Sequence, residues 1–341
     1  MGIVTDVFNQ NAWGTLDIHE RIIERVDHVP SLLGSLGIFE PWYSRSKTLA
    51  VADRDHTVKL IPTSESGTPP AEYVPKGARV RYFKPSRIAE GSTVYADEVA
   101  GLTELPFGDQ FREVAREVAE RTMGINRDID LTLEHMRFGA ISGKVYDADG
   151  TTELVDWFDE WGVTPPSAVN FALTTATTDI KKVIRNIKRN MQLKAKGRWL
   201  PGTGIIALCG DNFFDALVDH PVYKETKVNN ERTRELENIE GFSAVLYEGV
   251  LFINYRGTDD GSTISIGTDA ARIFPRGGGF FQMAYSPMSE FKPYANQIAR
   301  ERYSMILEDP SGRQEWDRVE IYSRPLAICN APELLFSATK A

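Results

Sequence analysis

The sequence has little cysteine and histidine. Its 341 residues include two cysteines and five histidines. Cys209 and Cys329 stand far apart, which argues against a disulfide framework or a cysteine-based zinc site, so both are expected to be small buried apolar residues. The histidines show no HxH or HxxxH spacing. We therefore predict neither a metal nor a cofactor.

Long hydrophobic runs are also absent. No stretch of about 18 or more apolar residues occurs, and the start, MGIVTDVFNQNAW, lacks the basic and apolar regions of a secretory signal. We expect a soluble chain that stays inside the cell that makes it and has no membrane partner. The 42% hydrophobic and 26% charged residues are typical of one elaborate globular domain or two. The net charge of −9 argues against indiscriminate nucleic-acid binding, although a local basic face could still bind it.

Motifs of catalysis and nucleotide binding are missing as well. There is no GxSxG elbow, so no catalytic residue is predicted. In GTGIIALCGDNFFDALVDH two glycines precede the strand, which is the wrong order for a dinucleotide site, and we expect a strand, a turn and an Asp-capped helix beginning near Asn212. FPRGGGF, residues 274–280, is predicted to be a turn. An enzyme built on a carboxylate pair that the fold brings together stays open.

One Pro- and Gly-rich stretch stands between two strand-like segments. PTSESGTPPAEYVPKG, residues 62–77, is preceded by HTVKLI and followed by ARVRYF. In the second segment, Val80 and Tyr82 alternate with Arg79 and Arg81, as in a strand. Matched strands favour a long extended hairpin over a linker between domains. Such a hairpin cannot bury itself and needs a neighbour.

Two segments have helical periodicity. Apolar residues recur with a period near 3.6 from Phe111 to Ala140, which predicts a long amphipathic helix. Residues 179–198 predict a second helix that begins at Asp179 and has one apolar and one strongly positive face. The positive face is either simply solvated or binds phosphate or an acidic partner.

The remaining segments read as strands. LVDWFDEWGVTPPS is interpreted as an aromatic strand closed by prolines. GFSAVLYEGVLFINYRG predicts a hairpin around Glu248 and Gly249, and RYSMILEDPSGRQEWDRVEIYSRPLAIC predicts another that turns at 309–312. The fold class is therefore α+β, with a mixed sheet packed on helices.

The order of these parts, with EYVPKGARVRYFKP and the ending SRPLAICNAPELLFSATKA, resembles the major capsid protein E family of lambda-type tailed phages, which has the Hong Kong 97 phage type shell fold. The resemblance implies four regions. They are an N-terminal arm (1–48), an extended loop (49–95), a peripheral domain (96–165 and roughly 271–320, with a spine helix at 109–140) and an axial domain (166–270 and roughly 321–341).

The resemblance also implies the function and its residues. Copies would self-assemble in the host cytoplasm into an icosahedral virion head around double-stranded DNA, without catalysis. The hairpin would contact a neighbouring subunit through Pro69, Pro70, Tyr73, Pro75, Lys76, Arg79, Arg81 and Lys84. The basic helix would face DNA or a partner through Lys181, Lys182, Arg185, Lys188 and Arg189.

Several partners follow from the same resemblance. They are other copies in pentamers and hexamers, a scaffolding protein, a portal, a decoration protein at three-fold positions and packaged DNA held by non-specific contact. An encapsulin-like cellular nanocompartment, which would share the fold but hold protein cargo, is the alternative.

Overall fold

The computed structural model describes residues 32–53, 79–95, 98, 107–195, 197–228, 238–239, 242–255, 264, 266–313 and 315–341. Its first elements are α3 (Leu32–Ser35), β1 (Glu40–Tyr43), β2 (Leu49–Asp53), β3 (Arg79–Phe83), β4 (Ile88–Tyr95), α5 (Phe107–Ser142), β5 (Lys144–Tyr146), β6 (Glu153–Asp156) and α6 (Trp157–Trp161). The middle of the chain forms β7 (Val169–Asn170), α7 (Ile180–Lys194), β8 (Gly204–Cys209), α8 (Asp211–Asp219), α9 (Pro221–Val228), β9 (Asn238–Ile239), β10 (Phe242–Tyr247) and β11 (Val250–Asn254). The last elements are β12 (Ala270–Arg276), β13 (Phe281–Tyr285), the 3-10 helix η3 (Lys292–Tyr294), β14 (Tyr303–Glu308), β15 (Trp316–Ser323), β16 (Pro325–Cys329), the 3-10 helix η4 (Pro332–Leu334) and β17 (Phe336–Thr339).

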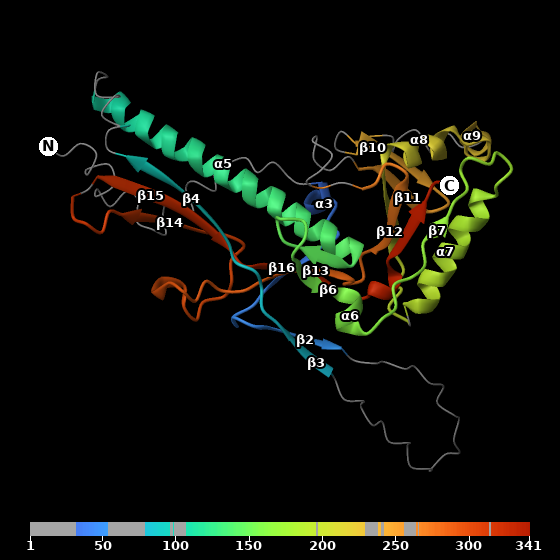
Figure 1. Cartoon of the computed structure of the whole chain (residues 1–341), viewed down its shortest axis with the longest axis horizontal. Coiled ribbons are helices and arrows are strands. Elements are labelled where there is room, and N and C mark those ends of the chain that lie inside the picture. The colour runs from blue at the N-terminus through green and yellow to red at the C-terminus, as the bar shows by residue number, and fades with distance from the viewer. Residues whose placement is uncertain are drawn as a thin grey trace, which may run out of the picture.

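The largest sheet has seven strands in the order β7-β17-β12-β8-β11-β10-β9. It is mixed, because β8 pairs parallel with β11 and antiparallel with β12. The apolar run Ile205–Cys209 in β8 is buried at every position, so both faces of the sheet are covered there. Figure 1 shows α7, α8 and α9 beside this sheet.

The long helix α5 joins this sheet to a second one. It packs on the three-stranded sheet β14-β15-β4, and its C-terminal end reaches β5, β12 and β16 (Figure 1). The apolar stripe that the sequence predicted is buried: Ile125, Ile129, Leu133, Met136 and Ala140. At about 1.5 Å per residue the helix spans about 54 Å. The predicted helix at 109–140 is thus confirmed.

A small central sheet, β1-β13-β16, lies between the two larger ones, and β1 pairs parallel with β13 although some 240 positions separate them in the chain. Two ribbons complete the strands, β2 with β3 and β5 with β6. The mixture of helices and mixed sheets confirms the α+β class.

Both predicted C-terminal hairpins are present. β10 and β11 turn at Glu248 and Gly249, whose φ angles of 51° and 79° suit a tight hairpin turn. β14 and β15 pair antiparallel, and Asp309 accepts a hydrogen bond from the Ser311 amide (2.8 Å) in their turn. The turn predicted in FPRGGGF is confirmed at its glycines, since Gly277, Gly278 and Gly279 all have positive φ between β12 and β13, whereas residues 274–276 belong to the end of β12. The strand predicted at HTVKLI lies outside the described residues.

Three local predictions were wrong. WFDEW forms helix α6 rather than a strand, because the Asp156 carboxylate caps it by accepting from the Phe158 and Asp159 amides (2.8 and 3.3 Å). Helix α8 begins at Asp211, close to the predicted start near Asn212, but its N-cap residue is Gly210 and no side chain caps it, so the predicted Asp cap is wrong. Helix α7 is capped by Asp179 as predicted but ends at Lys194 rather than Arg198.

Candidate assembly surfaces

The inner face of the β2–β3 ribbon packs on its own chain. Phe83 meets the buried Trp157 of α6 edge to face, with 5.2 Å between ring centroids. Arg81 Nη1 lies 3.3 Å from Glu160 Oε2, and its guanidinium lies 5.1 Å from the centre of the Trp161 ring. The ribbon is therefore anchored on α6 by an aromatic contact and a partly exposed ion pair.

The opposite face of the ribbon is open. Val80 is 47% exposed and Tyr82 is 72% exposed. Across the ribbon they pair with Ala52 and Ala50, so the residues directly opposite them on β2 are small. This open ribbon face is apolar, and a two-stranded ribbon with one unburied apolar face is marginal in water.

The predicted contact residues of the hairpin fall in different places. Pro69, Pro70, Tyr73, Pro75 and Lys76 lie outside the described residues. The backbone of Arg79 opens β3, and Lys84 is exposed just after it. Arg81 is partly occupied by its own chain, so its contact with a neighbour stays a prediction. Beyond the tip, sequence reasoning assigned the contact to the cations Arg79, Arg81 and Lys84, although the alternation of Val80 and Tyr82 already marked a second face.

Two ion pairs of Glu290 hold the segment between β3 and β4, where the hairpin begins. Arg87, just before β4, approaches Glu290 with Nε 3.1 Å from Oε2, and it also lies over the Tyr322 ring at 5.0 Å. The buried Arg324 pairs with the other oxygen of Glu290. One carboxylate thus ties the outgoing arm of the hairpin to the junction of β15 and β16. Because it receives two guanidinium groups, both oxygens are satisfied.

A buried carboxylate on α5 connects three segments. Glu134 Oε1 accepts hydrogen bonds from the Leu33 amide (2.9 Å) and the Tyr255 hydroxyl (3.2 Å). Its other oxygen lies 3.8 Å from Arg137 Nη1. Burial and the Glu134 charge raise the pKa of Tyr255, so its hydroxyl stays a donor. Glu134 therefore fixes α3 and the end of β11 to the long helix.

A second buried group holds α5 to its three-stranded sheet. Arg302, only 4% exposed, lies just before β14. Its Nη1 donates to Asn126 Oδ1 at 2.6 Å, and its Nη2 pairs with Asp130. Buried charges of this kind are stable only when paired and hydrogen-bonded, so the geometry of this contact is tightly specified.

Helix α7 has the two faces that the sequence predicted. Its apolar stripe is buried in the core: Ile180, Ile184, Ile187 and Met191. Lys182, Arg185 and Arg189 are exposed, whereas Lys181 and Lys188 are half-buried. Arg185 pairs with Glu248 at 3.4 Å. Whether this face meets DNA or a partner stays a prediction at this point.

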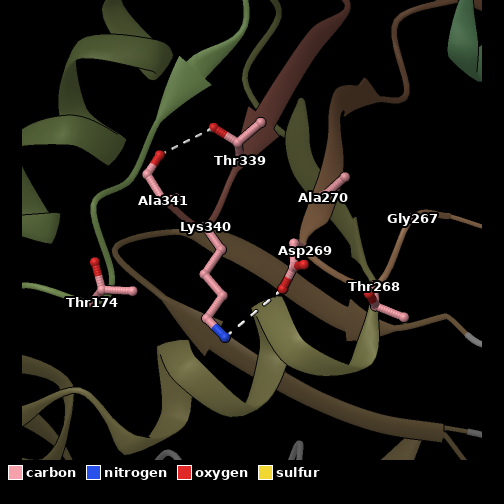
Figure 2. A pocket seen from close by; sticks show the side chains of 8 residues that line it. All are labelled: Thr174, Gly267, Thr268, Asp269, Ala270, Thr339, Lys340 and Ala341. Carbon is pink, nitrogen blue, oxygen red and sulfur yellow. Dashed lines mark hydrogen bonds and ion pairs between the residues drawn. The ribbon is translucent and has the colours of Figure 1, made fainter.

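A surface recess lies where the chain end meets the loop before β12. Figure 2 shows its lining, which consists of Thr174, Gly267, Thr268, Asp269, Ala270, Thr339, Lys340 and Ala341. Lys340 Nζ reaches across to Asp269 Oδ1 at 3.8 Å. Asp269 is the one lining residue with a side-chain carboxylate, and that carboxylate is already paired with an amine, which is not the pattern of an acid and base pair of side chains for catalysis.

The cysteines are buried and free, as predicted. Burial raises the pKa of Cys329 to about 12 and raises that of Cys209 as well, so neither thiol is a poised nucleophile. Within the part of the chain that the structure describes, no cluster of three His, Cys, Asp or Glu residues suits a metal ion. No helix among the described residues is long and apolar enough to cross a membrane.

Comparisons with known proteins agree on one family. The chain matches the family model for phage major capsid protein E over residues 20–340. It is 23% identical over 345 residues to the major capsid protein of Salmonella phage Felix O1 (isolate Felix O1-VT1), covering 92% of each chain. It is 30% identical over 203 residues to the major capsid protein of Pseudomonas phage KPP10, covering 53% of this chain and 56% of that one. Among solved structures, the putative capsid protein of a prophage of E. coli CFT073 superimposes with a TM-score of 0.51 at 14% identity, over 77% of this chain and 80% of the other.

Proposed function

The chain belongs to the phage major capsid protein E family, and we propose that each copy lays the open face of its β2–β3 ribbon on a neighbouring copy in the shell. The protein is a phage major capsid protein that forms an icosahedral shell, and its place is the capsid of the virion. Its α+β architecture is the Hong Kong 97 type capsid fold. The family assignment favours the phage shell over the nanocompartment and enzyme alternatives.

The open ribbon face carries this proposal. Val80 and Tyr82 expose apolar surface on a ribbon whose other face already packs on α6. Burying a tyrosine and a valine against another chain removes that surface from water, and tyrosine is enriched at the buried centre of protein interfaces. The Arg81 and Glu290 contacts hold the ribbon in place before a neighbour arrives, which lowers the entropy lost on association.

We also propose a division of the chain into the four regions of this fold. The arm is 1–48 and the extended loop is 49–95. The axial domain is built on the seven-stranded sheet and the peripheral domain on α5 with the β14-β15-β4 sheet. Because β12 pairs inside the seven-stranded sheet, we draw the axial boundary after Arg276, a few residues later than the predicted 271.

Further partners are proposed from family membership. They are pentamers and hexamers of the chain itself, a scaffolding protein, a portal, a decoration protein at three-fold positions and packaged double-stranded DNA held without sequence preference. Shared interfaces that bury more than the standard area of about 1,600 Å² would suit a shell that resists internal pressure.

The test uses the full chain co-expressed with its scaffolding protein. Tyr82→Ser with Val80→Thr removes the apolar contact, and Tyr95→Ser removes a tyrosine that is 49% exposed but lies on β4. We expect the double variant to fold, by circular dichroism, yet to give few shells by electron microscopy, while Tyr95→Ser assembles like the wild type. A wild-type chain that forms no shells contradicts the capsid function. A double variant that assembles normally contradicts only the ribbon contact.

A further inference from the structure

The outward face of α7 combines cations with an exposed leucine. Lys182, Arg185 and Arg189 are exposed at spacing i, i+3, i+7, opposite the buried stripe of the helix. Leu193 follows one turn after Arg189 and is 80% exposed, and Leu200 in the next loop is 56% exposed. Contacts with a DNA backbone come from cations and polar groups and give an exposed leucine no partner, whereas protein interfaces combine apolar anchors with charge. This α7 face therefore suits a protein.

A complementary face exists on α8 of the same chain. Asn212, Asp215 and Asp219 are exposed at the same spacing, i, i+3, i+7. Asn212 donates to Asp269 Oδ1 (3.2 Å), which brings a further exposed carboxylate beside this α8 face. The two faces match in repeat and are opposite in sign. Figure 1 shows α7 along the right-hand edge of the molecule and α8 along the upper edge of the same half, so they are separate surfaces.

The cations of α7 and the carboxylates of α8 are not paired with each other within one chain. Arg185 pairs with Glu248, and Asp219 pairs with Lys224 at 3.0 Å. Lys182, Arg189 and Asp215 make no ion pair with the other described residues. Each chain thus presents one basic and one acidic helix face that are available to another copy.

We infer that the α7 face of one copy binds the α8 face of the next copy, an inference that rests on the proposed function. Because two different patches meet, the contact is head to tail, and repeating it closes a ring when the rotation fits. Such a ring is the geometry that a pentamer or hexamer requires. The individual ion pairs are weak, and the contact is expected to weaken with salt.

Charge reversal and rescue test the contact in the full chain co-expressed with its scaffolding protein. Lys182→Glu with Arg185→Glu and Arg189→Glu places like charges together, and we expect the shell yield to fall at least about tenfold. Adding Asp215→Lys and Asp219→Lys restores opposite signs and should recover most of that loss. The matched control reverses Lys47, Arg127 and Arg313, which are exposed elsewhere, and should still assemble. Sedimentation and electron microscopy measure the yield.

Any other result of the charge-reversal experiment contradicts the inference. It fails if the α7 reversal assembles like the wild type, if the α8 changes give no rescue, or if the control reversal is equally harmful. It also fails if the α7 reversal builds normal empty shells that retain less DNA, because the face would then be one for DNA. Wild-type shells in the same preparation show that the proposed function holds, so these failures concern the α7–α8 contact alone. If the wild type forms no shells, the proposed function fails and this inference fails with it.

Discussion

The seven-stranded sheet and the three-stranded sheet bury their residues in different ways. Around β8, neighbouring side chains such as Ala207 and Leu208 are fully buried on opposite faces of the strand. In β15, the buried Val319 and Ile321 alternate with Arg318 and Glu320, whose ion pair measures 2.7 Å. Charged side chains such as Arg302 and Arg324 are then buried beside this second sheet. The seven-stranded sheet is stabilised mainly by apolar burial, while the three-stranded sheet also depends on specific charged contacts.

The two kinds of contact differ in how well they tolerate small movements of the packed segments. Apolar packing tolerates small shifts without losing a partner, whereas a buried ion pair is favourable in one geometry only. The contacts of Glu134, Glu290 and Arg302 therefore act as fixed joints between segments far apart in the chain. The following substitutions, measured as urea unfolding of the unassembled subunit, separate the two kinds of stabilisation.

The largest effect is expected in the seven-stranded sheet. Leu208→Ala removes a fully buried side chain from a central strand with both faces covered. The lost burial and the cavity should lower the free energy of unfolding by about 2 to 5 kcal/mol. Leu131→Ala, at an exposed position on α5, is the matched control and should change it by less than about 0.5 kcal/mol. Equal effects at the two sites would contradict the account of this sheet.

An effect nearly as large is expected at Arg302. Arg302→Met keeps an unbranched side chain, although a shorter one, and removes the guanidinium that contacts Asp130 and Asn126. Because Asp130 then keeps its charge but loses the guanidinium, the free energy of unfolding should fall by about 3 kcal/mol. Adding Asp130→Asn removes that charge and should recover part of the loss. If the double variant is no more stable than Arg302→Met alone, the ion pair is not the source of the effect.

The smallest effect is a gain in stability and concerns Asp317. It stands directly opposite Glu308 across β14 and β15, and burial, together with the charges of Glu308 and Asp309, raises the pKa of Asp317. Because the pKa of Asp317 is higher in the folded chain than in the unfolded chain, ionisation of its carboxyl destabilises the fold. This destabilisation is absent below the unfolded pKa and develops as the pH rises through the folded pKa. Asp317→Asn should raise the free energy of unfolding by about 0.5 kcal/mol at pH 7.

The pH dependence of that gain is its control. Unfolding curves between pH 7 and pH 4 should show the advantage of Asp317→Asn shrinking as the wild-type carboxyl takes up its proton. An advantage that grows toward acid would show that the sign of the shift is opposite.

Local patterns in the sequence predicted the long elements well. The period of Ile125, Ile129 and Leu133 predicted α5, and Glu248 with Gly249 predicted a hairpin, because both depend on residues close in the chain. The short helix α6 was missed because aromatic residues favour strands, although Asp156 before it is a typical helix cap.

The long-range contacts of Glu134, Glu290 and Arg302, and the open ribbon face, could not be predicted from local patterns. Glu134 meets Leu33 and Tyr255 across more than a hundred positions, and no local pattern marks such a pairing. The alternation of Val80 with Arg81 showed that β3 has two faces. Only the packing of Arg81 on α6 shows which of them is left for a partner.

The central claim is that copies of this chain form a closed shell in which the open ribbon face is covered. Electron cryomicroscopy of the full chain co-expressed with the proposed scaffolding protein tests it most directly. The account predicts closed icosahedral particles in which Tyr82 of each copy is buried against a neighbouring copy. Discrete small oligomers, or shells in which Tyr82 stays exposed to solvent, would contradict it.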